Sequence, residues 1–241
     1  MTPSLTTWPP DVYVLIPAYM AAVSLEPVHK SLQAVVPVSN MCVVDDASAD
    51  GTSLLCERLG IHCIVHPGNR GKGAALTSGF AYLARERNAA WVLTMDADGQ
   101  HAPEDMPQFF QAMHNNSNAG IIIGARTISP KKMPWLRVFS NTLTSAALSL
   151  LCGYRIYDSQ SGYRLYNGRF LRMMCCRAQR FEMESEILLR AAYLHFPVSF
   201  VKVQTLYLNG NSHIVHFQDT IRWVKAVGIV WLQLKLHPNH E

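Results

Sequence analysis

No stretch of this sequence is long and apolar enough to predict a helix that crosses a membrane. Such a helix needs about 20 consecutive apolar residues, and the densest run, 226–232, is far shorter. The first ten residues, MTPSLTTWPP, lack the basic and apolar regions of a secretory signal. Charged residues are scarce at 16%, while apolar residues reach 49%, a composition that excludes a disordered chain. We therefore expect a folded cytoplasmic protein.

Several familiar sites are also missing. None of the six cysteines stands in a C-x-x-C motif, so we predict free thiols rather than disulfides or zinc. No G-x-G-x-x-G occurs, which argues against NAD or FAD. The segment HPGNRGKGA (66–74) fails as a P-loop, because His66 and Gly73 stand where that motif needs Gly and Ser or Thr. The basic residues are dispersed, without a recognised nucleic-acid-binding motif, so we expect no nucleic-acid partner.

Charge is distributed unevenly along the chain. Residues 1–119 carry 6 Lys and Arg against 11 Asp and Glu, whereas residues 120–241 carry 15 against 6. An acidic half and a basic half can enclose one ligand that combines an anion with a bound cation. The same asymmetry is also typical of surfaces that bind acidic lipids or nucleic acid.

Short apolar runs alternate with amphipathic segments over the first 125 residues. Runs without polar alternation predict strands buried on both faces, and intervening helices make such strands parallel. We therefore predict an α/β fold with a Rossmann-like, mostly parallel open sheet flanked by helices. The expected strands are 12–17, 41–46, 61–65, 91–96, 120–125 and 198–203. The expected helices are 24–36, 50–59, 72–88, 103–114, 135–151, 181–194 and 217–236, with a Ser-, Gly- and Tyr-rich loop at 153–164.

Sheets of this kind bind ligands beyond the carboxyl ends of their strands, and acidic residues follow two of the expected strands. Asp96 and Asp98 come directly after 91–95, and a divalent cation relieves the repulsion between two such carboxylates. At 43–52, VVDDASADGT, Asp50 is expected to cap a helix while Asp45 or Asp46 accepts hydrogen bonds from a ligand. An EF-hand match at 46–57 is rejected because a strand, not a helix, enters it. The basic, Gly-rich entry to the helix at 72 suits a phosphate.

Together these segments resemble family 2 glycosyltransferases with the GT-A fold, and most of all the polyprenyl- or dolichyl-phosphate sugar transferases. The segments that carry the resemblance cover residues 12–220. They are IPAY (16–19), VVDDASADGT (43–52), NRGKGAAL (69–76), TMDADGQHAPED (94–105), GAR (124–126), DSQSGYR (158–164), FEMESEILLRA (181–191) and NSH (211–213).

The resemblance implies inverting transfer of a sugar from a GDP- or UDP-sugar to a lipid-linked acceptor, with polyprenyl phosphate favoured, and it assigns roles by motif position. Asp98 and Glu184 are the catalytic candidates, and Asp98 and Gln100 are expected to ligate Mg²⁺ or Mn²⁺. Arg126 is expected to neutralise the leaving group. The candidates for donor binding, Arg126 among them, are Pro17, Tyr19, Val44, Asp46, Asp96, Ala97, Arg126, Ser161, Ser212 and His213.

The chain departs from the family pattern at two places. Met20 and Ala21 replace the Asn and Glu that usually follow IPAY, and Ser185 replaces the acid that usually serves as base. A phosphate acceptor is already ionised and needs no base, so Ser185 favours a lipid phosphate. The alternatives are a hydroxyl acceptor with Glu184 as base, a non-catalytic nucleotide-sugar-binding protein, and a nucleotidyltransferase. The last is disfavoured, because IPAYMAAVS has no Gly-rich basic loop.

The expected domain organisation has three parts. Residues 1–11 form an extension, and residues 12–216 form a single GT-A domain with a nucleotide-sugar half (12–125) and an acceptor half (126–216). Residues 217–241 form an amphipathic helix and tail. That helix carries Trp223 and Trp231 beside basic residues, so it could lie in a lipid interface on the inner face of a membrane. Docking on the sheet is the equally open alternative.

Overall fold

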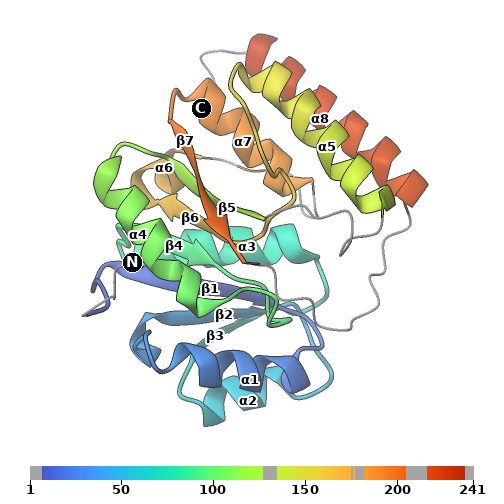
Figure 1. The fold of residues 1–241 in the computed structure, drawn as a ribbon. Coiled ribbons are helices and arrows are strands. Elements are labelled where there is room, and N and C mark those ends of the chain that lie inside the picture. The colour runs from blue at the N-terminus through green and yellow to red at the C-terminus, as the bar shows by residue number, and fades with distance from the viewer. Residues whose placement is uncertain (1–6, 127–134, 175, 177–181, 205–215, 237–241) are drawn as a thin grey trace.

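The structure is a computed structural model of the 241-residue chain. It describes residues 7–126, 135–174, 176, 182–204 and 216–236 (Figure 1). These residues form one open seven-stranded sheet with the strand order β3-β2-β1-β4-β6-β5-β7. The strands are β1 (Val12–Ala18), β2 (Met41–Asp45), β3 (His62–Val65), β4 (Trp91–Thr94), β5 (Ile121–Arg126), β6 (Arg164–Asn167) and β7 (Val198–Val203).

All neighbouring strands pair in parallel except β6, which runs antiparallel to both β4 and β5. The α-helices are α1 (Ala22–Leu32), α2 (Thr52–Arg58), α3 (Lys72–Ala81), α4 (Met106–Asn115), α5 (Trp135–Cys152), α6 (Gly168–Met173), α7 (Met183–Tyr193) and α8 (His216–Leu236). Short 3₁₀ turns precede β2 (Val38–Asn40) and α4 (Pro103–Asp105), and a π-helical turn (Tyr82–Glu86) continues α3.

The sheet lies between two hydrophobic layers, because successive side chains of a strand point to opposite faces. On β1, Val14 and Ile16 pack with α1, α2 and α4, whereas Leu15 packs with α3, α6 and α7. Figure 1 shows α1 and α2 on one side of the sheet and α5, α7 and α8 on the other. The prediction of a mostly parallel open sheet flanked by helices is therefore confirmed.

The main error of the sequence prediction lies at 164–173. We expect a loop to residue 164 and no strand after it, but Arg164–Asn167 form β6 and Gly168–Met173 form α6. The run RLYN is too short and too polar at its ends to predict a strand. It becomes one because it pairs on both sides, with Leu93 and Ile122 opposite Leu165.

The two long helices α5 and α8 both pack against α7. Val227 and Val230 of α8 are buried in the layer that contains α7, and the Trp223 Nε1–H donates to Ser185 Oγ (2.8 Å). The described part of α8 therefore docks on the domain through one face. None of the helices within the described ranges is long and apolar enough to span a bilayer.

Candidate active site

The carboxyl ends of four parallel strands form the edge that carries the acidic residues. The register aligns Ala18 of β1 with Asp45 of β2, and Asp45 with Val65 of β3. The segments that follow these strands therefore leave the sheet at the same edge. After β4, the chain continues into Asp96 and Asp98, so that the predicted acidic pair lies at this edge as well.

Lys72, the first residue of α3, connects two acids at this edge. Its Nζ lies 2.8 Å from Asp96 Oδ1 and 3.0 Å from Glu184 Oε1 of α7. The side chains of Lys72, Asp96 and Glu184 are 23%, 29% and 11% exposed, so the three charges are partly screened from water. Asp96 and Glu184 are predicted site residues, whereas Lys72 belongs to the basic helix entry that we expect to suit a phosphate, not to pair with these acids. A lysine that opens a helix at an acidic sheet edge was the available signal.

The ammonium of Lys72 dominates the ionisation of this cluster. Burial alone raises the pKa of Asp96, but the attraction of Lys72 and, to a lesser extent, of His101 outweighs burial and brings it to about 2. The pKa of Lys72 is likewise raised by Asp96 and Glu184 against the effect of burial. Asp96 and Lys72 are therefore both ionised at neutral pH.

His101 completes the surroundings of Asp96. Its Nδ1 accepts a hydrogen bond from the backbone N–H of Asp96 (3.1 Å), so the proton of the neutral ring sits on Nε2, 3.9 Å from Asp96 Oδ2. The ring stacks on Tyr163 at 4.8 Å between centroids. Burial lowers the pKa of His101, which keeps the imidazole neutral at physiological pH.

Asp98 lies in a different environment from Asp96. Its side chain is exposed, and Oδ1 accepts a hydrogen bond from the backbone N–H of Gln100 (3.0 Å) across a turn at Gly99. We expected the two neighbouring acids to share a cation, but Asp96 has Lys72 as its counter-charge. The two acids therefore have different partners in this structure.

The donor set around Asp98 still suits a hard cation. Within the described parts of the chain, no three His, Cys, Asp or Glu side chains are grouped so that they could hold a metal. Mg²⁺ typically takes one or two protein carboxylates and fills its remaining positions with water and substrate phosphate. An exposed carboxylate such as that of Asp98, followed two residues later in the chain by the amide residue Gln100, fits that mode of binding.

The predicted nucleoside-binding residues differ in their accessibility. Tyr19 is 55% exposed and Pro17 is half-buried at the end of β1, so both reach the surface of the edge. Val44 is fully buried in the core, and Ala97 is 8% exposed. A role for the side chain of Val44 would require the core to open.

Asp45 and Asp46 are both buried. Asp46, 3% exposed, accepts hydrogen bonds from His66 Nδ1 (2.7 Å) and from the backbone N–H groups of Arg70 (3.0 Å) and Gly71 (2.6 Å). We expected the N–H groups at the entry to α3 to serve a phosphate, but two of them are occupied by Asp46. Asp45 accepts from the Ser48 N–H, while its Oδ2 has no partner within the described residues.

Arg126 is held by a buried carboxylate. Its Nε and Nη2 donate to Asp158 Oδ2 (2.8 Å) and Oδ1 (3.0 Å), and Asn141 donates to the same carboxylate. Asp158 is fully buried, but the Arg126 side chain remains 23% exposed. Asp158 thus orients the guanidinium. This residue lies in the segment DSQSGYR (158–164), but its role as the partner of Arg126 is not predicted from the sequence.

The loop before β6 packs directly against the ion cluster. A Cβ on Gly162 would lie 2.8 Å from Asp96 Oδ2 and 3.0 Å from Lys72 Nζ. Ser161 beside it is 1% exposed, and its Oγ has no hydrogen-bond partner in the described structure. Of the remaining predicted donor-site residues, Ser212 and His213 lie outside the described residues.

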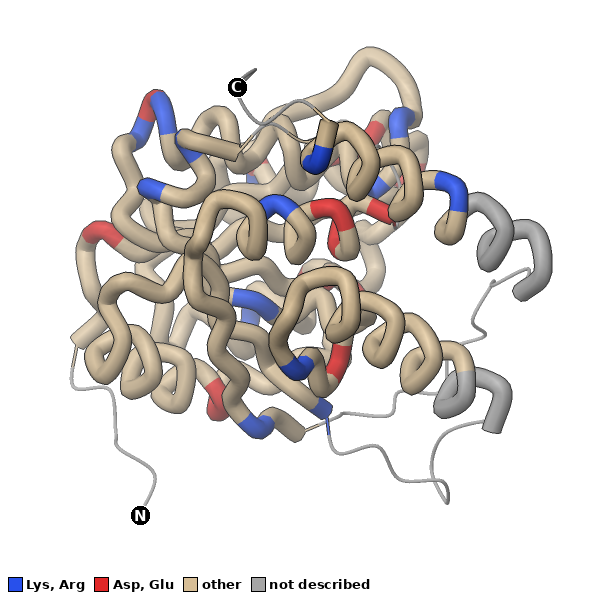
Figure 2. The backbone as a smooth tube through the Cα atoms, turned by 90° about the horizontal axis from the view of Figure 1, so that it is seen from above, with Lys and Arg blue, Asp and Glu red and all other residues tan. Residues whose placement is uncertain are grey.

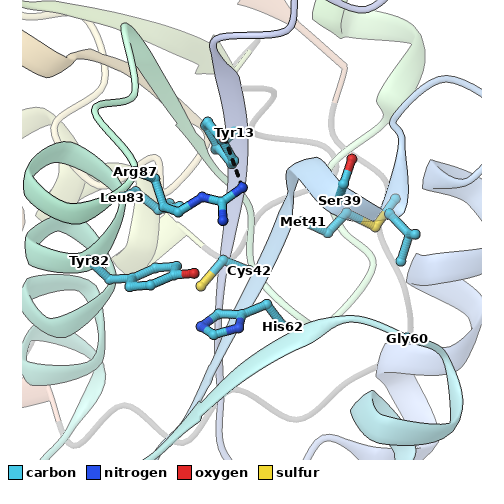
Figure 3. A pocket seen from close by; sticks show the side chains of 10 residues that line it. Tyr13, Ser39, Met41, Cys42, Gly60, His62, Tyr82, Leu83 and Arg87 are labelled. Carbon is cyan, nitrogen blue, oxygen red and sulfur yellow. Dashed lines mark hydrogen bonds between the residues drawn. The ribbon is translucent and has the colours of Figure 1, made fainter.

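A cavity of about 230 Å³ lies elsewhere, at the amino-terminal edge of the sheet. Figure 3 shows the ring of Tyr82 over that of His62, and the Arg87 guanidinium directed to Tyr13. No acidic residue lines it. It is therefore separate from the cluster around Asp96.

Comparison with known proteins places the chain. The family model described as "Glycosyl transferase family 2" matches residues 13–188. The chain is 32% identical, over 81% of its length and 86% of the relative's, to a UDP-N-acetylglucosamine–dolichyl-phosphate N-acetylglucosaminyltransferase of Methanococcus voltae. It is 30% identical to a polyprenol monophosphomannose synthase of Mycolicibacterium smegmatis, over 66% of this chain and 62% of that protein.

A solved structure shows the same fold. Glucosyl-3-phosphoglycerate synthase from Mycobacterium tuberculosis, crystallised with Mn²⁺, UDP and glucosyl-3-phosphoglycerate, superposes with a TM-score of 0.69 at 17% identity. The match covers 92% of this chain and 79% of that one. The predicted GT-A fold is thereby confirmed, and the chain belongs to family 2 of the glycosyltransferases.

Proposed function

We propose that this glycosyltransferase moves a sugar from a GDP- or UDP-sugar, with inversion, to a lipid-linked acceptor, and that the acceptor is polyprenyl phosphate. The named relatives include a dolichyl-phosphate and a polyprenol-phosphate sugar transferase, which supports this class of acceptor. The observation that favours a phosphate over a hydroxyl acceptor is the ion pair between Glu184 and Lys72. A hydroxyl acceptor needs a base, and a phosphate does not.

Glu184 is poorly suited to act as that base. Its Oε1 accepts a hydrogen bond from the Lys72 ammonium at 3.0 Å, so this oxygen already has a cationic partner and is not free to accept the proton of a hydroxyl. The next acid along α7, Glu186, is 1% exposed and bonds to Arg190 Nε (2.8 Å). Ser185 lies between them and accepts from Trp223. These contacts favour an acceptor that arrives already ionised.

The remaining residues of the edge would serve the donor. Asp98 and Gln100 would hold Mg²⁺ or Mn²⁺, and such a cation, when bound, stabilises the negative charge that develops on a departing diphosphate. Arg126, oriented by Asp158, would direct its exposed N–H groups to the same charge. Asp96, ionised and paired with Lys72, would accept hydrogen bonds from sugar hydroxyls.

Contact with a lipid surface is part of the proposal. Figure 2 shows the described turns of α5 and α8 as mostly tan helices on one side of the molecule. Both helices expose large apolar side chains, and α8 also carries exposed Lys225 and Lys235. An apolar face with basic residues beside it suits the inner face of an anionic membrane. The exposed apolar side chains are Leu143, Leu150, Val224, Ile229, Leu232 and Leu236.

A transfer assay tests the proposal. The protein is incubated with GDP- and UDP-sugars, dolichyl or undecaprenyl phosphate, and either Mn²⁺ or EDTA, and lipid-linked sugar is measured. We expect Mn²⁺-dependent product, lost in Asp98→Ala. Glu184→Gln keeps an oxygen for Lys72 but cannot take a proton, so it should retain activity within about tenfold. A loss of about 100-fold or more would instead assign Glu184 as base for a hydroxyl acceptor.

The membrane contact has its own test. Binding to vesicles with and without anionic lipid is compared between the natural chain and the double variant Ile229→Gln, Leu232→Gln. Val23→Gln and Leu54→Gln, two exposed apolar residues of α1 and α2, serve as matched controls. We expect weaker binding only for the α8 variant, and equal binding by all would reject the contact.

A further inference from the structure

Three side chains form a hydrogen-bonded chain at the carboxyl ends of β2 and β3. His66, directly after β3, lies 2.7 Å through Nδ1 from Asp46 Oδ1, directly after β2. Its Nε2 lies 2.9 Å from Ser78 Oγ in α3. Asp46 and His66 are 3% and 5% exposed. The chain thus ties two strand ends to one helix in a region sheltered from water.

The chemistry of the partners sets the direction of these bonds. The Asp46 carboxylate also accepts from the backbone N–H groups of Arg70 and Gly71, so it acts as the acceptor and His66 Nδ1 as the donor. The other ring nitrogen, Nε2, lies within hydrogen-bonding distance of the Ser78 hydroxyl. A ring held at both nitrogens has one tautomer and one orientation, and it fixes the carboxylate that it bonds.

The fixed carboxylate in turn holds the loop that leads to Lys72. The backbone N–H groups of Arg70 and Gly71 both donate to Asp46. Gly71 adopts φ 91° and ψ 163°, a conformation that residues other than glycine rarely adopt. Lys72 follows immediately and begins α3. Its backbone position, set by these two bonds, decides whether Nζ reaches Asp96 and Glu184.

We propose that His66 is a positioning residue for the transfer reaction, acting through Asp46 and the Arg70–Gly71 peptides on Lys72. This inference rests on the proposed function for its kinetic consequence. Its structural content, that the side chain of His66 controls the conformation at Gly71, is independent of any activity. In the sequence, His66 is notable only as a residue that rules out a P-loop at 66–74.

Two substitutions at position 66 separate the two bonds of the ring. In His66→Asn the side-chain amide can replace the Nδ1 donor to Asp46, whereas His66→Ala removes both bonds. Loss of a hydrogen bond to a charged group corresponds to a change of roughly 10- to 100-fold in rate. We expect His66→Ala to lower kcat by that factor with the donor KM within about threefold, and His66→Asn to restore most of it. Ser78→Ala should give a smaller loss.

An NMR measurement does not depend on turnover. With ¹⁵N-glycine labelling, the Gly71 amide resonance should shift in His66→Ala and return toward its original position in His66→Asn. Ser31→Ala, which removes a comparable helical hydroxyl from α1, should leave it unchanged. If His66→Ala fails to fold, Ser78→Ala and His66→Asn provide the comparison, with a smaller Gly71 shift in Ser78→Ala.

The outcomes are distinct. An unmoved Gly71 resonance, or a rise in donor KM at constant kcat, overturns the positioning role. A natural chain that shows no transfer while Gly71 still responds to His66 refutes the proposed function and leaves the structural coupling intact.

Discussion

Replacing Lys72 by methionine should destabilise the protein most at neutral and alkaline pH. The substitution keeps the length of the side chain but leaves Asp96 and Glu184 without the ammonium that lies 2.8 and 3.0 Å from them. Breaking a fully buried ion pair costs about 3–5 kcal/mol, and an exposed pair contributes at most about 1 kcal/mol. With 11–29% of the three side chains exposed, we expect about 2 kcal/mol.

The pH dependence follows from the sign of the Asp96 shift. In the natural chain its pKa is about 2, below the ordinary value, so its contribution is present above about pH 4 and is lost as the pH falls toward 2. In Lys72→Met, the largest of the attractions that oppose burial is lost and the pKa of Asp96 rises, so the variant loses stability relative to the natural chain as the pH rises. The difference between the two proteins should therefore grow between about pH 3 and pH 7.

Urea unfolding at pH 4, 6 and 8 measures this difference. At pH 8 the expected loss corresponds to a fall in Tm of roughly 4–8 °C for a chain of this size. Lys30→Met removes an exposed lysine of α1 and should change stability by less than about 0.5 kcal/mol at every pH. A Lys72→Met effect that is the same at pH 4 and pH 8 would refute the electrostatic account.

Three further predictions concern the neighbours of this cluster. Asp158→Asn removes the buried charge that holds Arg126 and should cost about 3 kcal/mol in urea unfolding; a loss below about 1 kcal/mol would contradict the assigned pair. Gly162→Ala places a methyl group 2.8 Å from Asp96 Oδ2, so transfer activity should fall at least tenfold with a change in Tm of only a few degrees, and unaffected activity would place the reaction elsewhere. Because burial lowers its pKa, the His101 ring should stay neutral at pH 6.5 in a ¹⁵N NMR titration, and half-protonation at that pH would show a solvated ring.

The sequence predicts β1, β2, β4 and β5 because each of them contains an uninterrupted apolar run. The antiparallel β6 is different. Arg164 begins it and is fully buried, with its guanidinium donating to the backbone carbonyls of Ser159, Ser161 and Glu184. An arginine whose guanidinium donates to carbonyls of its own loop and of α7 has no recognisable signature in the sequence, so neither its burial nor the strand that it opens can be predicted from spacing.

The candidate site, like the fold, can be predicted from the sequence only in part. Asp96 and Asp98 could be placed at one edge because parallel strands end together, and both lie there. Their different states could not be predicted, because they depend on contacts over long sequence distances. Lys72 and Glu184 are brought to Asp96 by the packing of α3 and α7 on one face of the sheet.

In the folded chain, ion pairs form both between and within the acidic and basic halves of the sequence. We expect the acidic half to supply the cation site and the basic half to bind phosphates. The ion pairs at the site do not follow this division of charge. Lys72 belongs to the acidic half and joins Asp96 of its own half to Glu184 of the basic half. Within the basic half, Arg126 is paired with Asp158.

Asp98 differs from the other acidic residues at the carboxyl edge of the sheet. Its side chain is exposed, whereas Asp45, Asp46 and Glu184 are buried and Asp96 is paired with Lys72. Under the proposed function, a cation that arrives with a nucleotide diphosphate would meet the exposed carboxylate of Asp98. Because the Asp98 carboxylate bonds to the backbone N–H of Gln100 rather than to Lys72, Asp98→Ala should remove metal-dependent transfer without the loss of stability expected for Lys72→Met. That difference is the reason the metal proposal can be tested separately from the integrity of the fold.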